Sequence, residues 1–415
     1  MPLFYFRPRR LTLVALLGSL ALPGLAAALS LDEALRLAEN QAPSLAAQVA
    51  NLEAARQAAI PASELPDPKL NLGLRNVPIE ADSAWRFDAE PMTMQAIGLV
   101  QEVPNSAKRR ARVEAAEAGV DLAETRQRIA LLDVRRQVAE AWIAARSVEE
   151  KLALFQQLYA ENRLFERAVR ARIAGGAGSA ADGIVPRQEA ALLAEQEDEL
   201  LRNQAVARAA LRRWIGEAAE QPLSGNWPTW PTDAGWYRER LPQHPQLQAY
   251  EPLTREAEAR LREAVADKRP DWAWGVEYGR REAFGDMVSL SLSVDLPLFA
   301  GSRQNPRIAA EQARLAQVAA EREDTLHQHA QALTADLAEL QRLRSSLARL
   351  DQTLVPLAED RVRLALADYR GGRGELGAVV AARQALLQTR LRRIDVARDR
   401  ALTNARLHFA YGDTP

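Results

Sequence analysis

The chain has 415 residues, of which 47% are hydrophobic, so it is long enough for two or three ordinary domains or for one elongated domain. Its 54 basic and 55 acidic side chains nearly cancel, which excludes the basic surface that nucleic-acid binding requires. Cysteine is absent, which excludes disulfides, thiolate chemistry and a lipid attached to an N-terminal cysteine.

Residues 1–28 have the pattern of a cleaved signal peptide. A basic stretch precedes an apolar run at 11–22, and three small alanines follow at 26–28. The apolar run is shorter than the roughly 20 residues that a membrane-spanning helix needs. We therefore expect this segment to direct the chain out of the cytoplasm and to be removed. The mature chain would then carry neither a helical membrane anchor nor a lipid anchor.

The rest of the chain contains one pattern twice, at 29–216 and at 244–412, joined by a linker at 217–243 and followed by a tail at 413–415. Each copy has a glycine pair, an Arg-Gln pair and a final glycine at the same spacing. Each copy predicts a helix, two strands, a very long helix, a glycine turn and a return helix. The expected elements of the first copy are helix 32–59, strands 69–78 and 92–103, long helix 108–174 and return helix 187–213. Those of the second are helix 246–268, strands 271–280 and 287–297, long helix 308–370 and return helix 377–410.

The two long segments, 108–174 and 308–370, are almost free of proline and glycine. Their apolar residues recur at spacings of three, four and seven, which indicates amphipathic helices about 100 Å and 95 Å long. Two shorter helices laid end to end would match each long helix, which predicts a rod of nearly uniform length. A coiled-coil filament is an alternative, but a filament has no strand pairs between its helices.

The expected strands alternate between apolar and polar residues. The clearest is MVSLSLSVDLPLF at 287–299, where Val288, Leu290, Leu292 and Val294 share one face, and Ser289, Ser291, Ser293 and Asp295 share the other. Such strands are typical of a transmembrane β-barrel, whose apolar side faces lipid and whose polar side lines a water-filled pore. A half-buried sheet in a soluble protein alternates in the same way. The signal peptide and the length of the helices favour the barrel.

Four strands cannot close a barrel alone, because bacterial barrels begin at eight strands and an open edge in lipid leaves backbone groups unpaired. We therefore expect a mainly α protein with membrane β structure, in which long antiparallel helical hairpins form a tunnel. Its four transmembrane strands per chain would close as a twelve-stranded barrel in a homotrimer embedded in outer-membrane lipid.

A family resemblance lies in the order, spacing and duplication of six segments: LSLDEALRLAENQAPSL, LPDPKLNLGL, VQEVPNSAKRRARVEAAEA, KRPDWAWGVEYG, VDLPLFAGSRQNPRIAAEQARL and YRGGRGEL. Together they resemble the TolC family of outer-membrane efflux channels over essentially the whole mature chain. QEVPNSAKRRAR and RPDWAWGVEYG are most similar to its heavy-metal branch, the CzcC- and CusC-like proteins. The resemblance implies an exit duct that docks to a periplasmic adaptor (membrane fusion) protein and to an inner-membrane RND-type pump. The expected cargo is heavy-metal cations, and drugs or small organic compounds are the alternative.

The resemblance also implies roles for the two glycine turns, which in that family form the periplasmic tip. There the tunnel narrows and the adaptor docks. Ala378 and Ala381 occupy the positions of the family's ring of pore-lining aspartates, so that ring is missing here. Asp182 matches a tip aspartate, and we expect it to interact with Arg373. The residues expected at the tip and gate are Asp182, Arg370, Arg373 and Glu375; those expected at the turns and the adaptor-docking surface are Gly175, Gly176, Gly178, Gly371, Gly372, Gly374 and Leu376.

The sequence has no catalytic constellation, so we expect no enzyme activity, no cofactor and no metal site. His327 and His329 are two residues apart, which on a helix points them about 200° apart rather than toward one ion. His408 has no second ligand nearby in the sequence. Met92 and Met94 share a strand face and thioethers suit Cu(I), but packing is the simpler interpretation.

An alternative of another class is a periplasmic coiled-coil adaptor or scaffold protein. An adaptor would have one helical hairpin with a lipoyl-like β-domain between its helices. This sequence instead predicts two hairpins with amphipathic strand pairs. The linker segment SGNWPTWPTDAGWY at 224–237 predicts an irregular but packed loop, which suits a mixed belt around the middle of the helices.

Overall fold

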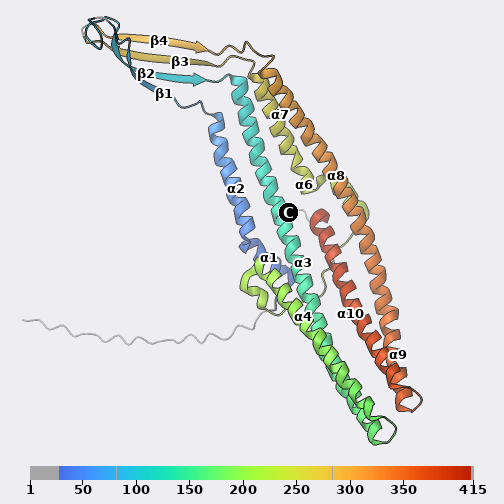
Figure 1. The fold of residues 1–415 in the computed structure, drawn as a ribbon. Helices are drawn as coiled ribbons and strands as arrows, with labels where there is room; N and C mark the ends of the chain where they lie inside the picture. Colours follow the sequence, from blue (N-terminus) through green and yellow to red (C-terminus); the bar gives the residue numbers. More distant parts are fainter. Residues whose placement is uncertain (1–27, 81, 283, 413–415) are drawn as a thin grey trace, which may run out of the picture.

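The computed structural model describes residues 28–80, 82–282 and 284–412, so the predicted signal peptide at 1–28, apart from its last residue, and the tail at 413–415 lie outside the described residues. The described chain is a long rod of helices with a four-stranded sheet extending from one end (Figure 1). The turns that connect the two helices of each hairpin form the opposite end. The sheet and the turns therefore lie at opposite ends of the rod.

The first half contains helices α1 (Leu31–Gln41), α2 (Pro43–Ala59), α3 (Ser106–Ala174) and α4 (Val185–Ile215). The expectation of one helix over 32–59 is wrong, because Ala42 adopts an extended conformation and separates α1 from α2. The residue before a proline is sterically disfavoured in the α region, so Pro43 ends one helix and begins the next.

The second half contains α6 (Pro245–Gln248), α7 (Tyr250–Ala266), α8 (Gln304–Arg349), α9 (Val355–Arg370) and α10 (Leu376–Leu407). The expected single helix at 246–268 is thus divided at Ala249. The uniform helix expected over 308–370 is also corrected, since a π-helical turn separates α8 from α9. Pro356 follows this turn. It lacks a backbone N–H, and in an α-helix its ring would clash with the carbonyl group one turn earlier. The wider π-turn makes room for the ring, so the chain remains helical. Shorter elements are η1 (Ile60–Ser63), η2 (Ala180–Ile184), η3 (Gly216–Glu220), α5 (Ala234–Arg240), η4 (Leu241–Gln243), η5 (Leu350–Leu354) and η6 (His408–Gly412).

Helix α3 runs along the whole rod and packs against helices of both halves. Its upper part contacts α2 and α7, and its lower part contacts α4 and α10. In the second half, α8 and α9 together form the long helical element. The shorter α7 packs beside α8, and α10 packs beside α8 and α9. The main core lies at the middle of α3, where Val138, Trp142 and Ile143 are almost fully buried. At about 25 cal/mol per Å² of apolar area, this burial stabilises the packing of α1, α4 and α10 on α3.

The linker is packed onto this core rather than extended away from it. The Trp230 ring stacks on His408 with centroids 4.8 Å apart, and its backbone N–H donates to Asn404 Oδ1 at 2.7 Å. Trp227 Nε1 donates to Glu150 Oε2 at 2.9 Å. The linker therefore fixes the return helix α10 against α3 at mid-height.

The sheet contains β1 (Lys69–Arg75), β2 (Met94–Val103), β3 (Trp272–Arg280) and β4 (Met287–Val294). All pairs are antiparallel in the order β1-β2-β3-β4, so the two halves of the chain meet at the pairing of β2 with β3. The strands expected at 69–78 and 287–297 are longer than the observed ones, which end at Arg75 and Val294. Within the described chain, β1 and β4 are edges with no strand beyond them.

Candidate functional site

One face of the sheet is apolar and exposed across all four strands. The register places Leu70 beside Leu99, Leu99 beside Val276, and Val276 beside Leu290. Leu72 is 71% exposed and Leu290 is 80% exposed, values far from those of core residues. The members of this face, here called the apolar sheet face, are Leu70, Leu72, Leu74, Ile97, Leu99, Trp272, Trp274, Val276, Tyr278, Val288, Leu290, Leu292 and Val294. A continuous exposed surface of this kind marks contact with lipid or with another protein.

The opposite face is lined by small and polar residues. Ser289, Ser291 and Ser293 lie on it opposite Glu277, Gly275 and Ala273. Gly275 on this face is closely approached, because a Cβ on it would lie 2.6 Å from Ser291 Oγ. Arg75 reaches across β2 to form an ion pair with Glu277. This pair joins the two copies of the duplication, and nothing local in the sequence indicates it.

Asp295, which was expected to line the pore as part of the last strand, lies just after the end of β4. Its backbone N–H donates to the backbone oxygen of Asp271 at 2.8 Å. Asp295 therefore belongs to the junction between the sheet and the helices.

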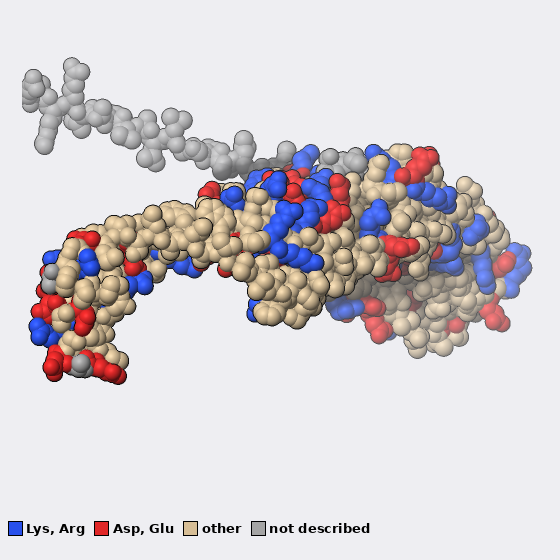
Figure 2. Space-filling view, turned by 90° about the horizontal axis from the view of Figure 1, so that it is seen from above, with Lys and Arg blue, Asp and Glu red and all other residues tan. Residues whose placement is uncertain are grey.

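The side of the sheet seen in Figure 2 is a band of low charge between two charged regions. Figure 2 shows the arm formed by the strands largely without Lys, Arg, Asp or Glu, with charged residues at its far tip and over the helical body. The loops at the far tip include Glu80, Asp88, Arg281 and Asp286. In the described ranges, no helix has a segment long and apolar enough to cross a membrane.

A polar network fastens the strands to the helices. Asn105 caps α3 by accepting a hydrogen bond from the Lys108 backbone N–H at 3.0 Å, and its own backbone N–H donates to Asp271 Oδ1 at 2.7 Å. Lys108 Nζ contacts Asp267 at 2.9 Å and Asp271 at 3.1 Å. Partial burial alone would raise the pKa of Asp271, but the hydrogen bonds from Asn105 and Lys108 outweigh it and lower that pKa. The start of α3 and the start of β3 are thus held together.

The two turns at the far end of the rod have the same backbone geometry. After α3, the Gly176 N–H donates to Ile173 O and the Ala177 N–H to Arg172 O; after α9, the equivalent bonds end at Tyr369 O and Asp368 O. This is the Schellman arrangement, which requires a left-handed residue after the helix. Gly176 and Gly372 supply it, each with φ of +75°.

The remaining glycines of the turns do not adopt the left-handed conformation. Gly178 and Gly374 are instead sites of close approach. A Cβ on Gly374 would lie 3.0 Å from the Asp368 Cβ, and one on Gly178 would lie 3.2 Å from Ile173 Cγ1. Gly175 and Gly371 are the C-cap residues of α3 and α9.

The expected tip residues lie at the turns, but the structure does not join Asp182 to Arg373 within the described part of the chain. Asp182 forms a capping box with Ser179 at the start of η2. Arg373 lies 3.5 Å from Asp368 in its own turn. Glu375 is the extended N-cap residue of α10, where its side chain makes no capping bond. Arg370 is exposed in the last turn of α9.

Leu376, expected at the docking surface, is 8% exposed and packs inward with Phe165, Val169 and Val379. Its side chain is therefore part of the core of the tip in this protomer. The functional roles of Asp182, Arg370, Arg373, Glu375 and the turn glycines stay predictions.

A contact that the sequence does not predict joins the ends of the two hairpins. The Arg172 guanidinium lies over the Tyr369 ring, 4.1 Å from its centroid, and also donates to the Tyr369 backbone oxygen. Arg172 Nε donates to Ala177 O at 3.1 Å in its own turn. Cation–π contacts contribute about 0.5–2 kcal/mol. Arg172 and Tyr369 each lie in the last helical turn before a glycine pair, but nothing in the sequence indicates that the two turns touch.

Two histidines that are distant in sequence are brought together at mid-height. His244 and His329 have ring centroids 3.9 Å apart, and His244 is 8% exposed. His244 Nδ1 accepts from the Gln246 backbone N–H at 3.2 Å, and His329 Nε2 pairs with Gln246 Oε1 at 2.8 Å. Across the described ranges, no three His, Cys, Asp or Glu side chains are placed to hold a metal ion. Met92 and Met94, considered above as thioether ligands, have different positions. Met92 precedes β2, and Met94 packs its sulfur beneath Gly279.

Burial, with a smaller contribution from His329, lowers the pKa of His244 to about 3. Between about pH 6.5 and pH 3 the unfolded chain binds a proton at this site that the folded chain does not, so folding stability must fall as the pH falls. We expect a loss of about 2 kcal/mol between pH 6.5 and pH 5, at 1.36 kcal/mol per unit. In His244→Asn, which keeps a capping acceptor but cannot be protonated, the loss should be smaller.

The measurement is the urea dependence of helical circular dichroism at the two pH values. His327→Gln, at an exposed position on α8, is the matched control and should keep the pH dependence of the parent. An equal pH dependence in His244→Asn and the parent would contradict the assignment.

An exposed apolar sheet on one end of a rod of long helical hairpins defines an outer-membrane channel protein. The chain belongs to the outer membrane efflux protein family, whose profile matches residues 34–217 and 236–413. This confirms the predicted family and places the chain among outer-membrane channel proteins rather than enzymes. No curated protein sequence matches the chain.

Solved structures share the fold. The outer membrane protein VceC of Vibrio cholerae is 20% identical, with a TM-score of 0.76 over 92% of this chain and 96% of that chain. CusC, described as forming a transmembrane channel, is 15% identical, with a TM-score of 0.80 over 92% of each chain. The open state of the MtrE outer membrane channel of Neisseria gonorrhoeae is 20% identical, with a TM-score of 0.75 over 92% of this chain and 88% of that chain. The predicted fold class, helical hairpins combined with membrane strands, is confirmed.

Proposed function

We propose that three copies of this chain form the exit duct of a tripartite RND-type efflux system. The observation that carries this proposal is the pair of open edges, β1 and β4, on a sheet whose apolar face is exposed. Unpaired backbone groups cost several kcal/mol each in lipid, so β4 of one protomer must pair with β1 of the next. Three sheets give a twelve-stranded barrel, with the serine face toward the pore and the helices as a tunnel through the periplasm.

The test uses the full-length protein expressed with its N-terminal segment and extracted from outer membranes in detergent. The expected result is a trimer that resists mild heating and forms conducting pores in planar bilayers. A monomer stable in plain buffer, or extraction without detergent, would overturn the proposal. Cleavage after about residue 28 would be read from the N-terminus of the purified protein.

We further propose heavy-metal cations as the cargo, on the similarity of QEVPNSAKRRAR and RPDWAWGVEYG to the heavy-metal branch. The periplasmic adaptor and the inner-membrane pump would then belong to a heavy-metal efflux system. The test is the growth of an efflux-deficient strain with and without this gene and its pump partners, in graded copper, zinc and cobalt, and in graded detergents and antibiotics. Protection against metals alone supports the proposal; protection against organic compounds alone identifies a drug duct.

In the resting duct, the contact between Arg172 and Tyr369 should restrain the tip. Arg172→Ala removes a stacked guanidinium and a charged donor between the two hairpins, a loss of about 2 kcal/mol per protomer. We therefore expect a higher mean single-channel conductance in planar bilayers. Arg373→Ala is the control, because the partner of Arg373 is on its own turn and the variant should conduct like the parent. A higher conductance in Arg373→Ala than in Arg172→Ala would mean that Arg373, and not Arg172, restrains the tip.

A further inference from the structure

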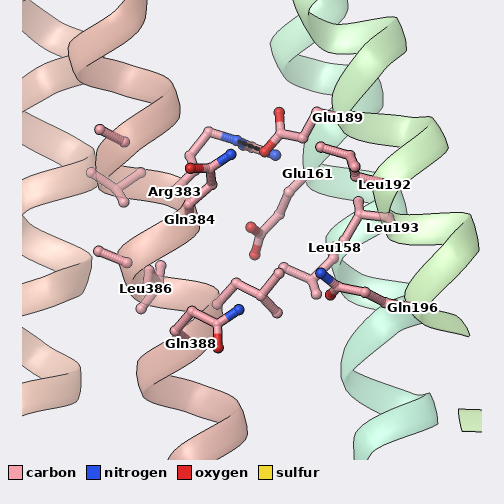
Figure 3. Close-up of a pocket in the computed structure, with 14 residues that line it drawn as sticks. Leu158, Glu161, Glu189, Leu192, Leu193, Gln196, Arg383, Gln384, Leu386 and Gln388 are labelled. Atoms are coloured by element: carbon pink, nitrogen blue, oxygen red, sulfur yellow. Dashed lines mark hydrogen bonds and ion pairs between the residues drawn. The ribbon is translucent and has the colours of Figure 1, made fainter. Parts of the chain in front are cut away.

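A cavity of about 480 Å³ lies between the two helical hairpins, above the tip (Figure 3). Helices α3 and α4 form one wall, and α9 and α10 form the other. Its volume is within the range of about 300–1,000 Å³ that small-molecule sites occupy. The apolar part of the lining includes Leu158, Leu193 and Leu386.

The polar part of the lining is rich in hydrogen-bond acceptors that have no donor. Glu189 Oε1 accepts from Arg383 Nε at 2.9 Å, but Glu189 Oε2 is buried without a hydrogen-bond partner. Gln196 Oε1 is also buried without a partner. Buried acceptors are nearly always paired in folded proteins, so two orphans in one cavity point to an absent donor.

The lining carries more negative than positive charge, which also favours a ligand that donates hydrogen bonds. Glu161 and Glu189 contribute two carboxylates, and Arg383, already paired with Glu189, contributes the one guanidinium among the lining residues. The Glu161 carboxylate points into the space between the hairpins in Figure 3. Arg390 lies 3.4 Å from Glu161 Oε1 but is closer to Glu359, at 2.8 Å. Glu161 therefore keeps capacity to accept from a ligand.

We propose that this cavity binds a small organic cation with an apolar body, such as an aryl amidine or an amine. Its N–H groups donate to the Glu161 carboxylate and to the orphaned oxygens of Glu189 and Gln196, and its body contacts the leucine side chains. The site is on the seam between two hairpins of one protomer, so this proposal does not depend on the cargo of the duct. Ordered water alone is the competing occupant.

The experiment is isothermal titration of the full-length protein in detergent with benzamidine, and with benzamide as the uncharged analogue of nearly the same shape. We expect benzamidine to bind at least tenfold more tightly than benzamide. Glu161→Gln and Gln196→Leu should each weaken benzamidine binding by about tenfold, as expected for the loss of a hydrogen bond to a charged group. Glu195→Gln, at an exposed position of α4 outside the cavity lining, makes the same charge change and should bind like the parent.

Equal binding of the two ligands, or no effect of Glu161→Gln, would overturn the proposal. No detectable binding of benzamidine would mean that water alone satisfies the orphaned acceptors. Helical circular dichroism of each variant must match the parent, so that a loss of binding is not a loss of folding.

Discussion

Leu290→Arg should abolish or strongly impair assembly of the channel in the outer membrane. Leu290 is 80% exposed at the centre of β4 and pairs with Val276 on the apolar sheet face. An arginine facing lipid near the bilayer midplane costs about 2–4 kcal/mol, and a trimer carries this cost three times. The measurement is the amount of heat-resistant trimer in isolated outer membranes.

Ser289→Arg is the matched control. Ser289 is the neighbouring residue of the same strand, but it lies on the opposite face, across from Glu277. A basic side chain there would lie beside a carboxylate in a water-filled pore, so the variant should assemble normally and change ion selectivity instead. Equal tolerance of arginine at the two positions would mean that the strand does not lie in a membrane.

The strand alternation and the glycine turns could be predicted because each depends on local chemistry. The repeat in MVSLSLSV follows from the two-residue period of a strand, so sequence alone assigns Leu290 and Ser291 to opposite faces. Gly176 and Gly372 each follow a long helix, where the Schellman turn needs a residue without a Cβ clash. Neither prediction requires knowledge of what packs against the segment.

The local breaks in the helices were harder to predict. Pro43 divides α1 from α2, while Pro356 is accommodated by a π-turn within a helix that continues. The same residue type thus ends one helix and only widens another. The difference depends on the tertiary contacts that hold α8 and α9 in line against α10, and these contacts are not local in sequence.

The contacts between the hairpins could not be predicted, because they join residues far apart in the chain. The expected pair of Asp182 and Arg373 followed from a family pattern, whereas the structure keeps each residue in its own turn. Arg172 and Tyr369 instead connect the two turns. The stacking of His244 on His329 is a similar case, since the two residues lie far apart in the chain.

The ion pair between Arg383 and Glu189 shows how little the duplication says about such contacts. The repeat aligns Arg383 with Arg187, but these two side chains have different environments. Arg383 on α10 is 9% exposed, pairs with Glu189 on α4, and lies over the Phe165 ring on α3, 4.9 Å from its centroid. Arg187 is exposed on the surface of α4. One arginine therefore connects three helices, and its counterpart in the repeat is on the surface.

Arg383→Met should consequently be among the most destabilising single substitutions in the helical rod. It leaves the Glu189 carboxylate, whose side chain is 13% exposed, without its guanidinium. Breaking a buried pair from one side costs about 3–5 kcal/mol, because the remaining charge stays desolvated. We expect a clear fall in the urea midpoint of the helical circular dichroism signal, whereas Arg187→Met should change the stability by no more than about 0.5 kcal/mol.

The double variant Arg383→Met, Glu189→Met separates the charge from the packing. Replacing both partners of a buried pair by apolar residues is often neutral, so the double variant should recover most of the stability that Arg383→Met loses. If instead the double variant is as unstable as Arg383→Met, the contact with Phe165 and the shape of the side chain hold α10 in place. Equal stability of Arg383→Met and Arg187→Met would show that the Arg383–Glu189 pair contributes no stability to the contact between the hairpins.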